Sequence, residues 1–274
     1  MVSHWTFQRA PVLVAGPCVI EDAAELTRVA DELAGIGLRL GLPVCLKASF
    51  DKANRSRLES PRGPGLQEGL AALAAAKRSS GLPVLTDVHE PGQARVAAEV
   101  VDAIQVPAFL SRQTDLLSAI GATGLPVNLK KGQWMAPEEM SGAVEKVKAG
   151  GSRDVAVTER GTAFGYGDLV VDMRVFDRLH ASVGTPVLFD ATHAVQQPGR
   201  GEGGSSGGLR RHVPALLLAA ASAGADGFYL ETHPDPARAL SDAATQWPLA
   251  DLEGLLARAL EVWHAARAMV RTTS

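Results

Sequence analysis

The sequence predicts a parallel (β/α)8 TIM barrel, a single domain over residues 1–274, and two observations lead to that prediction. A short phrase repeats along the chain: Gly-Leu-Pro-Val begins at Gly41, Gly81 and Gly124, and Gly-Thr-Pro-Val begins at Gly184. Each copy follows an Ala/Leu-rich helical stretch and precedes a short apolar run, as expected where a helix ends at glycine and a strand follows proline. The length of 274 residues also suits one such barrel, which usually takes about 250 residues.

Eight apolar runs are expected to form the strands: Val12–Ala15, Val44–Ala48, Val84–Val88, Ala103–Val106, Val127–Lys130, Val155–Thr158, Val187–Phe189 and Phe228–Leu230. Helices are expected between and after them, for example at Glu21–Leu40, Gln67–Ser79, Glu138–Ala149, Arg210–Ala223 and Leu249–Val270. Eight strands that alternate with helices match the barrel, and an open, doubly wound sheet is the alternative. No linker or change in composition divides the chain.

Composition and charge exclude several classes of protein. The formal net charge is −3 and Lys and Arg are spread along the chain, so nucleic-acid binding as the main role has little electrostatic support. Cys18 and Cys45 are too few for a disulfide framework, and we expect a reducing, cytoplasmic setting. The apolar run 11–20 lacks the basic flank of a secretory signal peptide and is broken by Gly16 and Pro17, so we do not expect it to act as one. No run reaches the roughly 18 apolar residues of a membrane span, so we expect a soluble protein.

Polar and ionisable residues lie at the end of every predicted strand or just after it. In parallel barrels the active site forms at the carboxyl ends of the strands, so these residues should gather around one mouth. We call them the strand-end ring: Cys18, Lys47, Asp87 with His89, Gln105, Lys130 with Lys131, Glu159 with Arg160, Asp190 with His193, and Glu231 with His233. Solvated loops explain some polar residues at such positions, but not cations beside so many metal-type ligands.

The cations near this mouth indicate anionic substrates. Arginine offers a fork and lysine a point charge to phosphate or carboxylate. Any single cation could instead form a surface ion pair, and for Lys131 a surface pair with glutamate is an equally favoured interpretation. The cations at strand ends or directly after them, taken as a set, favour anion binding. They are Lys47, Lys52, Arg55, Lys130 and Arg160.

A second theme is metal binding. Cys18, His193 and Glu231 end the first, seventh and eighth predicted strands, which become neighbours when a barrel closes, and Asp242 follows in the next loop. One thiolate, one imidazole and two carboxylates form a mixed donor set suited to Zn²⁺, Fe²⁺ or Mn²⁺. The spacing is not a compact metal motif, so the alternative of a small buried Cys18 stays open. Cys45 lies mid-strand and is expected in the core.

Two other groups of residues have structural interpretations. His4, His180, His212 and His264 fall on predicted helices or near the amino terminus, and we expect them to be structural or solvated. The stretch Gln196–Gly208 is rich in Gly and Ser. It is either a flexible linker or, because it directly follows a strand, a mobile active-site loop.

Several long motifs carry a resemblance along nearly the whole chain. They are the segments 47–56 (KASFDKANRS), 128–133 (NLKKGQ), 159–166 (ERGTAFGY), 189–193 (FDATH) and 230–236 (LETHPDP), together with Ser241 and Asp242. In these motifs the chain resembles the 3-deoxy-D-manno-octulosonate 8-phosphate synthase family. The resemblance implies a transferase that condenses phosphoenolpyruvate with D-arabinose 5-phosphate and water, releases phosphate, and serves lipopolysaccharide biosynthesis in Gram-negative bacteria.

The resemblance also implies roles for individual residues. Phosphoenolpyruvate would meet Lys47 and Lys52 at its carboxylate, Lys130 and Arg160 at its phosphate, and a pocket wall of Gln105, Pro107 and Ala108. Arabinose 5-phosphate would meet Asn54, Arg55 and Ser56, with Asp87 at its hydroxyls and Arg112 reaching in from a neighbouring subunit. The family is usually tetrameric, so a homo-oligomer is implied.

Members of this family are metal-dependent or metal-independent, with Cys or Asn, respectively, at the position that matches Cys18. The cysteine implies the metal-dependent type, with Zn, Fe, Mn or Co held by Cys18, His193, Glu231 and Asp242, and with His193 also counted among the catalytic residues. Ala243 departs from the glycine that many members have after the aspartate, which leaves the geometry of this loop open.

Two other functions remain open at this point. The related synthase that joins phosphoenolpyruvate to erythrose 4-phosphate (3-deoxy-D-arabino-heptulosonate 7-phosphate synthase) shares the barrel and the metal set. It has a Lys-Pro-Arg-Thr pattern where this chain has Lys-Ala-Asn-Arg-Ser at residues 52–56. The second alternative is a non-catalytic barrel that binds a partner, and the intact strand-end ring argues against it.

Overall fold

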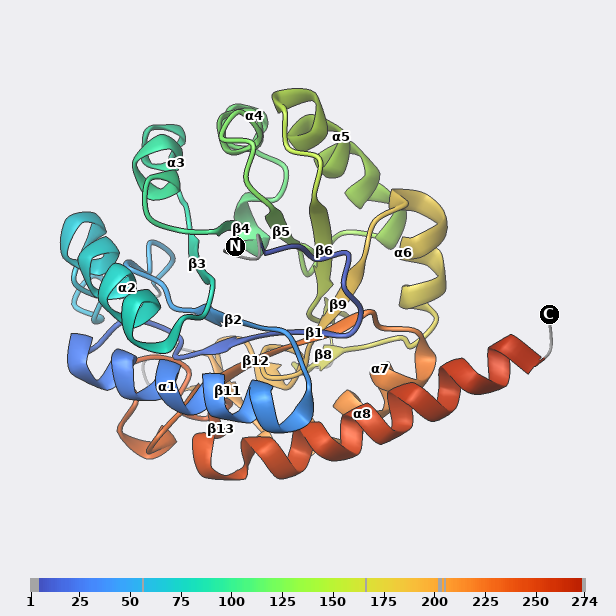
Figure 1. The fold of residues 1–274 in the computed structure, drawn as a ribbon. Coiled ribbons are helices and arrows are strands. Elements are labelled where there is room, and N and C mark those ends of the chain that lie inside the picture. Colours follow the sequence, from blue (N-terminus) through green and yellow to red (C-terminus); the bar gives the residue numbers. More distant parts are fainter. Residues whose placement is uncertain (1–4, 56, 166, 202–203, 205, 273–274) are drawn as a thin grey trace.

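The computed structural model describes residues 5–272 apart from residues 56, 166, 202–203 and 205. Its centre is a closed barrel of parallel strands with helices around the outside (Figure 1). The barrel strands are β1 Val12–Gly16, β2 Val44–Lys47, β3 Val84–Asp87, β4 Ala103–Val106, β5 Val127–Lys130, β6 Val155–Glu159, β9 Val187–Asp190 and β12 Gly227–His233. They pair in this order, and β12 pairs with β1 to close the sheet. The eight predicted strands and the single-domain (β/α)8 fold are confirmed, and the open sheet is excluded.

The helices that surround the barrel are α1 Ala23–Leu40, α2 Leu66–Ser80, α3 Pro91–Ala98, α4 Thr114–Gly121, α5 Met140–Gly150, α6 Val175–Val183, α7 Val213–Ala223 and α8 Leu249–Thr272. Three of them begin later than predicted, and one of these, α1, begins two residues late because Asp22 is its N-cap. The 3-10 turns Pro137–Glu139 and Arg210–His212 precede α5 and α7, so the first predicted turn of each has the tighter geometry. Among the described helices, none has the combination of length and hydropathy that a membrane crossing requires.

The repeated glycines act mainly through backbone conformation. Gly41, Gly81 and Gly184 cap α1, α2 and α6 with φ values of 62°, 70° and 57°, a left-handed conformation that favours glycine. A Cβ atom would meet nothing within 4 Å at any of these three positions, so packing does not explain them. Gly124 has the same conformation, at φ 71°, but α4 ends three residues earlier.

The core has an outer and an inner part. Alternate strand residues such as Leu13 pack outward against the helices, whereas Val12, Val14 and their counterparts fill the barrel. Trp5 and Phe7 belong to the inner cluster, and the Phe7 backbone N–H donates to Asp154 Oδ2 at 3.0 Å, which holds the amino-terminal segment to the start of β6. Cys45 is fully buried in the inner cluster, as predicted.

The shorter strands lie in loops on the carboxyl side of the barrel. They are β7 Thr162–Ala163 with β8 Leu169–Val170, β10 Gln196–Gln197 with β11 Gly207–Gly208, and β13 Trp247–Pro248, which pairs in parallel with the end of β12. Three of the four histidines given structural roles lie on α6, α8 and the turn before α7; His180, for example, lies 2.7 Å from Asp226. His4 lies outside the described residues.

Candidate active site

A chain of hydrogen bonds links the strand ends across the barrel mouth. Thr158 Oγ1 donates to Asn128 Oδ1 at 2.6 Å, and Asn128 Nδ2 donates to Gln105 Oε1 at 2.8 Å. Gln105 Nε2 donates to Asp87 Oδ1, and Ser49 Oγ donates to Asp87 Oδ2 at 2.6 Å. All five side chains are buried, so the chain of bonds fixes the orientation of Gln105 and Asp87.

Two lysines, one from β2 and one from the loop that follows it, bring positive charge close to these hydrogen-bonded side chains. Lys47 Nζ donates to Glu231 Oε1 at 2.8 Å, and Lys52 Nζ donates to Ser49 Oγ at 3.0 Å and lies 3.8 Å from Asp87 Oδ2. Burial alone would lower the pKa of Lys47, but the charges of Glu231 and Asp87 raise it well above its usual range. Burial would raise the pKa of Asp87, yet Lys47 and Lys52 hold it well below its ordinary value. These groups are therefore charged at neutral pH.

Lys130, the last residue of β5, lies between a carboxylate and an aromatic ring. Its Nζ is ion-paired with Asp190 and lies 3.3 Å from the centroid of the Tyr229 ring. Burial lowers the pKa of Lys130 to about 8, although the charge of Asp190 acts in the opposite direction. Burial would raise the pKa of Asp190, but the charges of His193 and Lys130 hold it well below its ordinary range.

One amino group of Arg160 is left for a ligand. Arg160 is 5% exposed, and its Nη2 donates to Gln196 Oε1 at 2.6 Å. Its Nη1 is buried and has no hydrogen-bond partner among the described residues. Buried donors normally have partners, and guanidinium groups pair well with phosphate and carboxylate, so this Nη1 fits an anionic oxygen.

The loop after β2 brings a second arginine to the same mouth. Arg55 Nη1 donates to Ser241 Oγ at 2.9 Å and Nε donates to the Pro61 carbonyl at 2.7 Å. Arg55 Nη2 is buried and, within the described part of the chain, lacks a hydrogen-bond partner. Asn54 is exposed, and Ser56 lies outside the described residues.

The remaining predicted substrate contacts follow β4. Ala108 is buried and Pro107 half-buried, directly after the strand that carries Gln105. Arg112 is exposed between the 3-10 turn Ala108–Leu110 and α4. Its guanidinium makes no hydrogen bond or ion pair with a described residue of this chain, so the barrel alone does not bring it into the mouth.

The four predicted metal ligands lie together. One donor atom each from Cys18, Glu231 and Asp242 lies within 4.8 Å of the other two, and Cys18 Sγ is 3.2 Å from Asp242 Oδ2. His193 Nε2 lies 3.7 Å from Glu231 Oε2 and 3.6 Å from Asp242 Oδ2. Cys18, His193 and Glu231 lie at or just after the ends of β1, β9 and β12, which are neighbours in the closed sheet, and Asp242 lies in the loop after β12.

This donor set fits a divalent metal ion. Glu231 Oε2 is buried and, among the described residues, has no hydrogen-bond partner, although it faces His193. His193 Nδ1 lies 2.6 Å from Asp190, which orients the ring with Nε2 toward the other donors. Burial would raise the pKa of Glu231, but Lys47 and His193 lower it to about 2. Burial and the charge of Glu231 raise the pKa of the Cys18 thiol, and a bound cation would oppose that rise.

The loop that carries Asp242 is held in an unusual conformation. Asp242 has φ 51° and is the one non-glycine among the described residues with a positive φ, which aspartate tolerates better than most residues. Its carbonyl accepts bonds from two following backbone N–H groups. Buried Gln246 accepts a bond from the Cys18 N–H at 3.3 Å and donates to the Ser241 carbonyl at 2.8 Å. The loop thus places Asp242 beside Cys18 with Ala243 in place of glycine.

A second group of possible donors consists of Glu21, Glu25 and His233. His233 Nε2 is 3.2 Å from Glu25 Oε1 and 3.8 Å from Glu21 Oε1. However, His233 Nδ1 accepts the Asp235 N–H at 3.0 Å, so in the neutral ring the proton sits on Nε2. A protonated Nε2 cannot bind a metal, and this group therefore acts as a contact between α1 and the end of β12.

One interpretation from the sequence is wrong. Lys131 is not at the surface: its side chain is fully buried and lies 3.4 Å from Glu159 Oε2. The partner is a glutamate, as expected, but the pair is inside the protein. Alternation along the strands explains this, because Lys130 faces the barrel interior and its neighbour must face the other way.

Sequence reasoning gave no site role to Ser49, Gln196 or Gln246. Ser49 lies within the motif 47–56 and Gln246 lies in no quoted motif, and neither residue carries a charge that would distinguish it. Gln196 begins the Gly/Ser-rich stretch after β9, and its position directly after a strand end could have indicated a role. In the structure β10 and β11 pair the two ends of this stretch, and its residues 202–203 and 205 lie outside the described residues.

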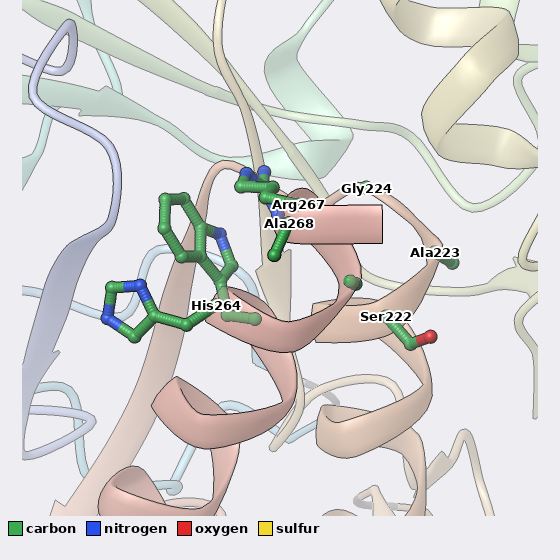
Figure 2. A pocket seen from close by; sticks show the side chains of 8 residues that line it. Ser222, Ala223, Gly224, His264, Arg267 and Ala268 are labelled. Atoms are coloured by element: carbon green, nitrogen blue, oxygen red, sulfur yellow. The ribbon is translucent and has the colours of Figure 1, made fainter. Parts of the chain in front are cut away.

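A separate hollow lies between the end of α7 and the last turns of α8 (Figure 2). Small residues such as Ser222 and Gly224 form one wall, and Trp263, His264 and Arg267 form the other. Arg267 stacks on Trp263 at 3.8 Å and donates to the Ala225 carbonyl, so its guanidinium is already engaged. The hollow lies at the amino end of β12, opposite the strand-end ring, which is the end of such barrels that supports stability.

Comparisons with known proteins identify the family of this chain. The DAHP synthetase I family matches residues 8–266. A 2-dehydro-3-deoxyphosphooctonate aldolase of Syntrophobacter fumaroxidans is 52% identical over 93% of this chain and 88% of its own length. Enzymes with the same name from Rhodopseudomonas palustris and Acidithiobacillus ferrooxidans are 53% and 49% identical, over 91% and 93% of this chain and 86% and 90% of their own lengths. This name denotes the synthase family that the motifs resemble, and the chain therefore belongs to the DAHP synthetase I family and, within it, to the 2-dehydro-3-deoxyphosphooctonate aldolases.

Proposed function

We propose that the protein condenses phosphoenolpyruvate with D-arabinose 5-phosphate and water to give 3-deoxy-D-manno-octulosonate 8-phosphate and phosphate, for lipopolysaccharide biosynthesis. The observation that carries the proposal is the 52% identity, over 93% of the chain, to an enzyme named for this product. The strand-end ring supports it, because both substrates are anions and the ring supplies cations at one mouth. The proposal places the reaction in the cytoplasm, where the Cys18 thiol stays reduced.

Phosphoenolpyruvate would lie among the cations of β2, β5 and β6. Lys47 and Lys52 face its carboxylate, and Lys130 with the free Nη1 of Arg160 holds its phosphate. Gln105, Pro107 and Ala108 form the wall of this pocket. The groups are oriented before substrate arrives, because the hydrogen-bond chain and the pairs with Asp190 and Gln196 fix them.

Arabinose 5-phosphate would occupy the side of the mouth nearer the loop after β2. Arg55, with Nη2 free, would meet its phosphate together with Asn54 and Ser56, and Asp87 would accept bonds from its hydroxyls. Arg112 of a neighbouring subunit would complete this end, which requires at least a dimer and agrees with a tetramer. Its exposure in the single chain supports this assignment.

Cys18, His193, Glu231 and Asp242 would hold one divalent ion, Zn, Fe, Mn or Co. When bound, the ion supplies a Lewis acid that orients the sugar aldehyde or the attacking water. The protein itself keeps the two anions together against their mutual repulsion, and such positioning contributes about 7–11 kcal/mol in well-oriented reactions. Carbon 3 of the enol attacks the aldehyde, water adds at carbon 2, and phosphate leaves by C–O cleavage.

Substrate choice distinguishes this function from the related erythrose 4-phosphate synthase. Because residues 52–56 read Lys-Ala-Asn-Arg-Ser rather than Lys-Pro-Arg-Thr, arabinose 5-phosphate should be turned over much faster than erythrose 4-phosphate or ribose 5-phosphate. A coupled assay that detects free phosphate, with each aldose phosphate plus phosphoenolpyruvate, measures this directly. Comparable rates with erythrose 4-phosphate would transfer the chain to the related activity, and no turnover of any aldose phosphate would favour a non-catalytic barrel.

The pKa of Lys130 predicts a pH effect on phosphoenolpyruvate binding. Burial lowers this pKa to about 8, so the ammonium is charged below that pH and neutral above it. The KM for phosphoenolpyruvate should therefore rise as pH increases through about 8, while the KM for arabinose 5-phosphate changes less. In Lys130→Arg the charge persists at all these pH values, and the rise should disappear. An identical pH profile in both proteins would exclude Lys130 as its cause.

A further inference from the structure

Lys131 and Glu159 form a buried ion pair immediately beside the residues that would hold phosphate. Lys131 follows Lys130 at the end of β5, and Glu159 precedes Arg160 at the end of β6. The side chains of the pair are 0% and 1% exposed, with Lys131 Nζ 3.4 Å from Glu159 Oε2. The two strands are adjacent and parallel, so the pair joins their ends.

The Lys131 ammonium also joins the loops that follow these strands. Its Nζ donates to the carbonyls of Gly132 and Met135, at 3.2 and 3.3 Å, in the loop after β5. It donates to Thr162 Oγ1 at 3.2 Å in the loop after β6. On the other side, Glu159 Oε1 accepts the N–H of Gly161. Lys130 and Arg160 are therefore each flanked by residues of one connected polar network.

Such a network is a costly way to fill space. Burying two charges requires desolvation that well-packed apolar residues would avoid, so a buried pair is weak evidence of a stability role. The network instead fixes the relative positions of the segments that it joins, because the acceptors around one ammonium must lie at defined distances and angles. Because the network joins the loops after β5 and β6, it should keep the adjacent cations, Lys130 and Arg160, at a constant separation.

We propose that Lys131 and Glu159 are positioning residues that set the placement of Lys130 relative to Arg160, and thereby the affinity for the phosphate of phosphoenolpyruvate. This inference rests on the proposed function, in which Lys130 and Arg160 hold that phosphate. Neither Lys131 nor Glu159 touches substrate. Their effect passes through the backbone to the adjacent side chains.

Two variants with little change in shape test this role. Glu159→Gln removes one charge and keeps an oxygen for the Gly161 N–H, and Lys131→Met removes the other charge at similar length. Each should raise the KM and the calorimetric Kd for phosphoenolpyruvate about tenfold, with the KM for arabinose 5-phosphate within about twofold of wild type. The matched control is Lys77→Met, which removes the half-exposed Lys77–Asp102 pair, 2.8 Å long, beside the amino end of β4. It should lower Tm and leave both KM values unchanged.

The outcomes separate the possibilities. A folded Glu159→Gln with a wild-type Kd for phosphoenolpyruvate would overturn the inference, and so would an equal rise in both KM values, because that indicates a general loss of structure. If Lys131→Met does not fold, Glu159→Gln still decides. A failure of the proposed function would appear in the wild type, as no turnover of the two substrates. A failure of the positioning role would leave the wild type active and the variants like it.

Discussion

Exhaustive dialysis against a chelator is expected to abolish activity, and added Mn²⁺, Fe²⁺, Co²⁺ or Zn²⁺ to restore it to differing degrees. Cys18, His193, Glu231 and Asp242 present sulfur, nitrogen and oxygen donors within a few ångströms of one another. Such a mixed set suits these ions rather than Mg²⁺ or Ca²⁺. Metal analysis of the purified protein, with activity measured before and after dialysis, checks the prediction. Full activity with no bound metal would contradict the proposed site.

Substitution of Cys18 sharpens this test. Cys18→Ser should weaken metal affinity by more than about 100-fold, because removing a metal ligand should lower the affinity more than removing a residue that only orients a ligand. Excess metal should restore its activity only in part. Cys18→Asn should keep some turnover that resists chelator, since the resemblance implies asparagine at this position in the metal-independent members of the family.

The second cysteine provides the control for these variants. Cys45 is also fully buried and unpaired, but it lies in the inner core away from the donors. Cys45→Ala should lower stability by about 1 kcal/mol or more through a small cavity, and leave metal content unchanged. If Cys45→Ala lost metal as readily as Cys18→Ser, loss of metal would reflect destabilisation rather than removal of a ligand.

The fold was predictable because its signals are local and repeated. Glycine, proline and a short apolar run mark the passage from helix to strand in each unit, and Gly41, Gly81 and Gly184 cap their helices as expected. The beginnings of α5 and α7 were less predictable. Pro137 begins the 3-10 turn before α5 and Pro214 lies in the first turn of α7, and proline is compatible with the start of either kind of helix, so the sequence does not fix which one forms.

The sequence allowed us to predict which residues meet at the site, because the order and direction of the strands decide this. The carboxyl ends of parallel strands meet at one mouth, which is why Cys18 and Glu231 could be placed together although 213 positions separate their numbers (231 − 18). Side-chain partners were not predictable in this way. Lys131 is buried because strand alternation turns it away from Lys130, and Gln246 reaches Cys18 only through the conformation of a long loop. Such contacts depend on packing that periodicity does not encode.

Removal of either phosphate-holding cation should cause a large loss of activity in a folded protein. Lys130→Ala and Arg160→Ala each delete a charge-assisted contact, which costs roughly 1.5–3 kcal/mol per bond, or about 10- to 150-fold in kcat/KM. The fold should survive, because Asp190 keeps its contact with His193 when Lys130 is absent, and Gln196 keeps its bond to Asp242 when Arg160 is absent.

The control for the loss of a positive charge is Arg174→Ala. Arg174 pairs with Asp172 on the surface, and its side chain is 85% exposed, so its removal should change neither activity nor stability measurably. Steady-state kinetics with both substrates, together with circular dichroism and Tm, complete the comparison. The loss in Lys130→Ala and Arg160→Ala should also exceed that in Glu159→Gln, since a displaced cation still attracts phosphate and a missing one does not. Near-normal kcat/KM in either alanine variant would place that residue outside the phosphoenolpyruvate pocket.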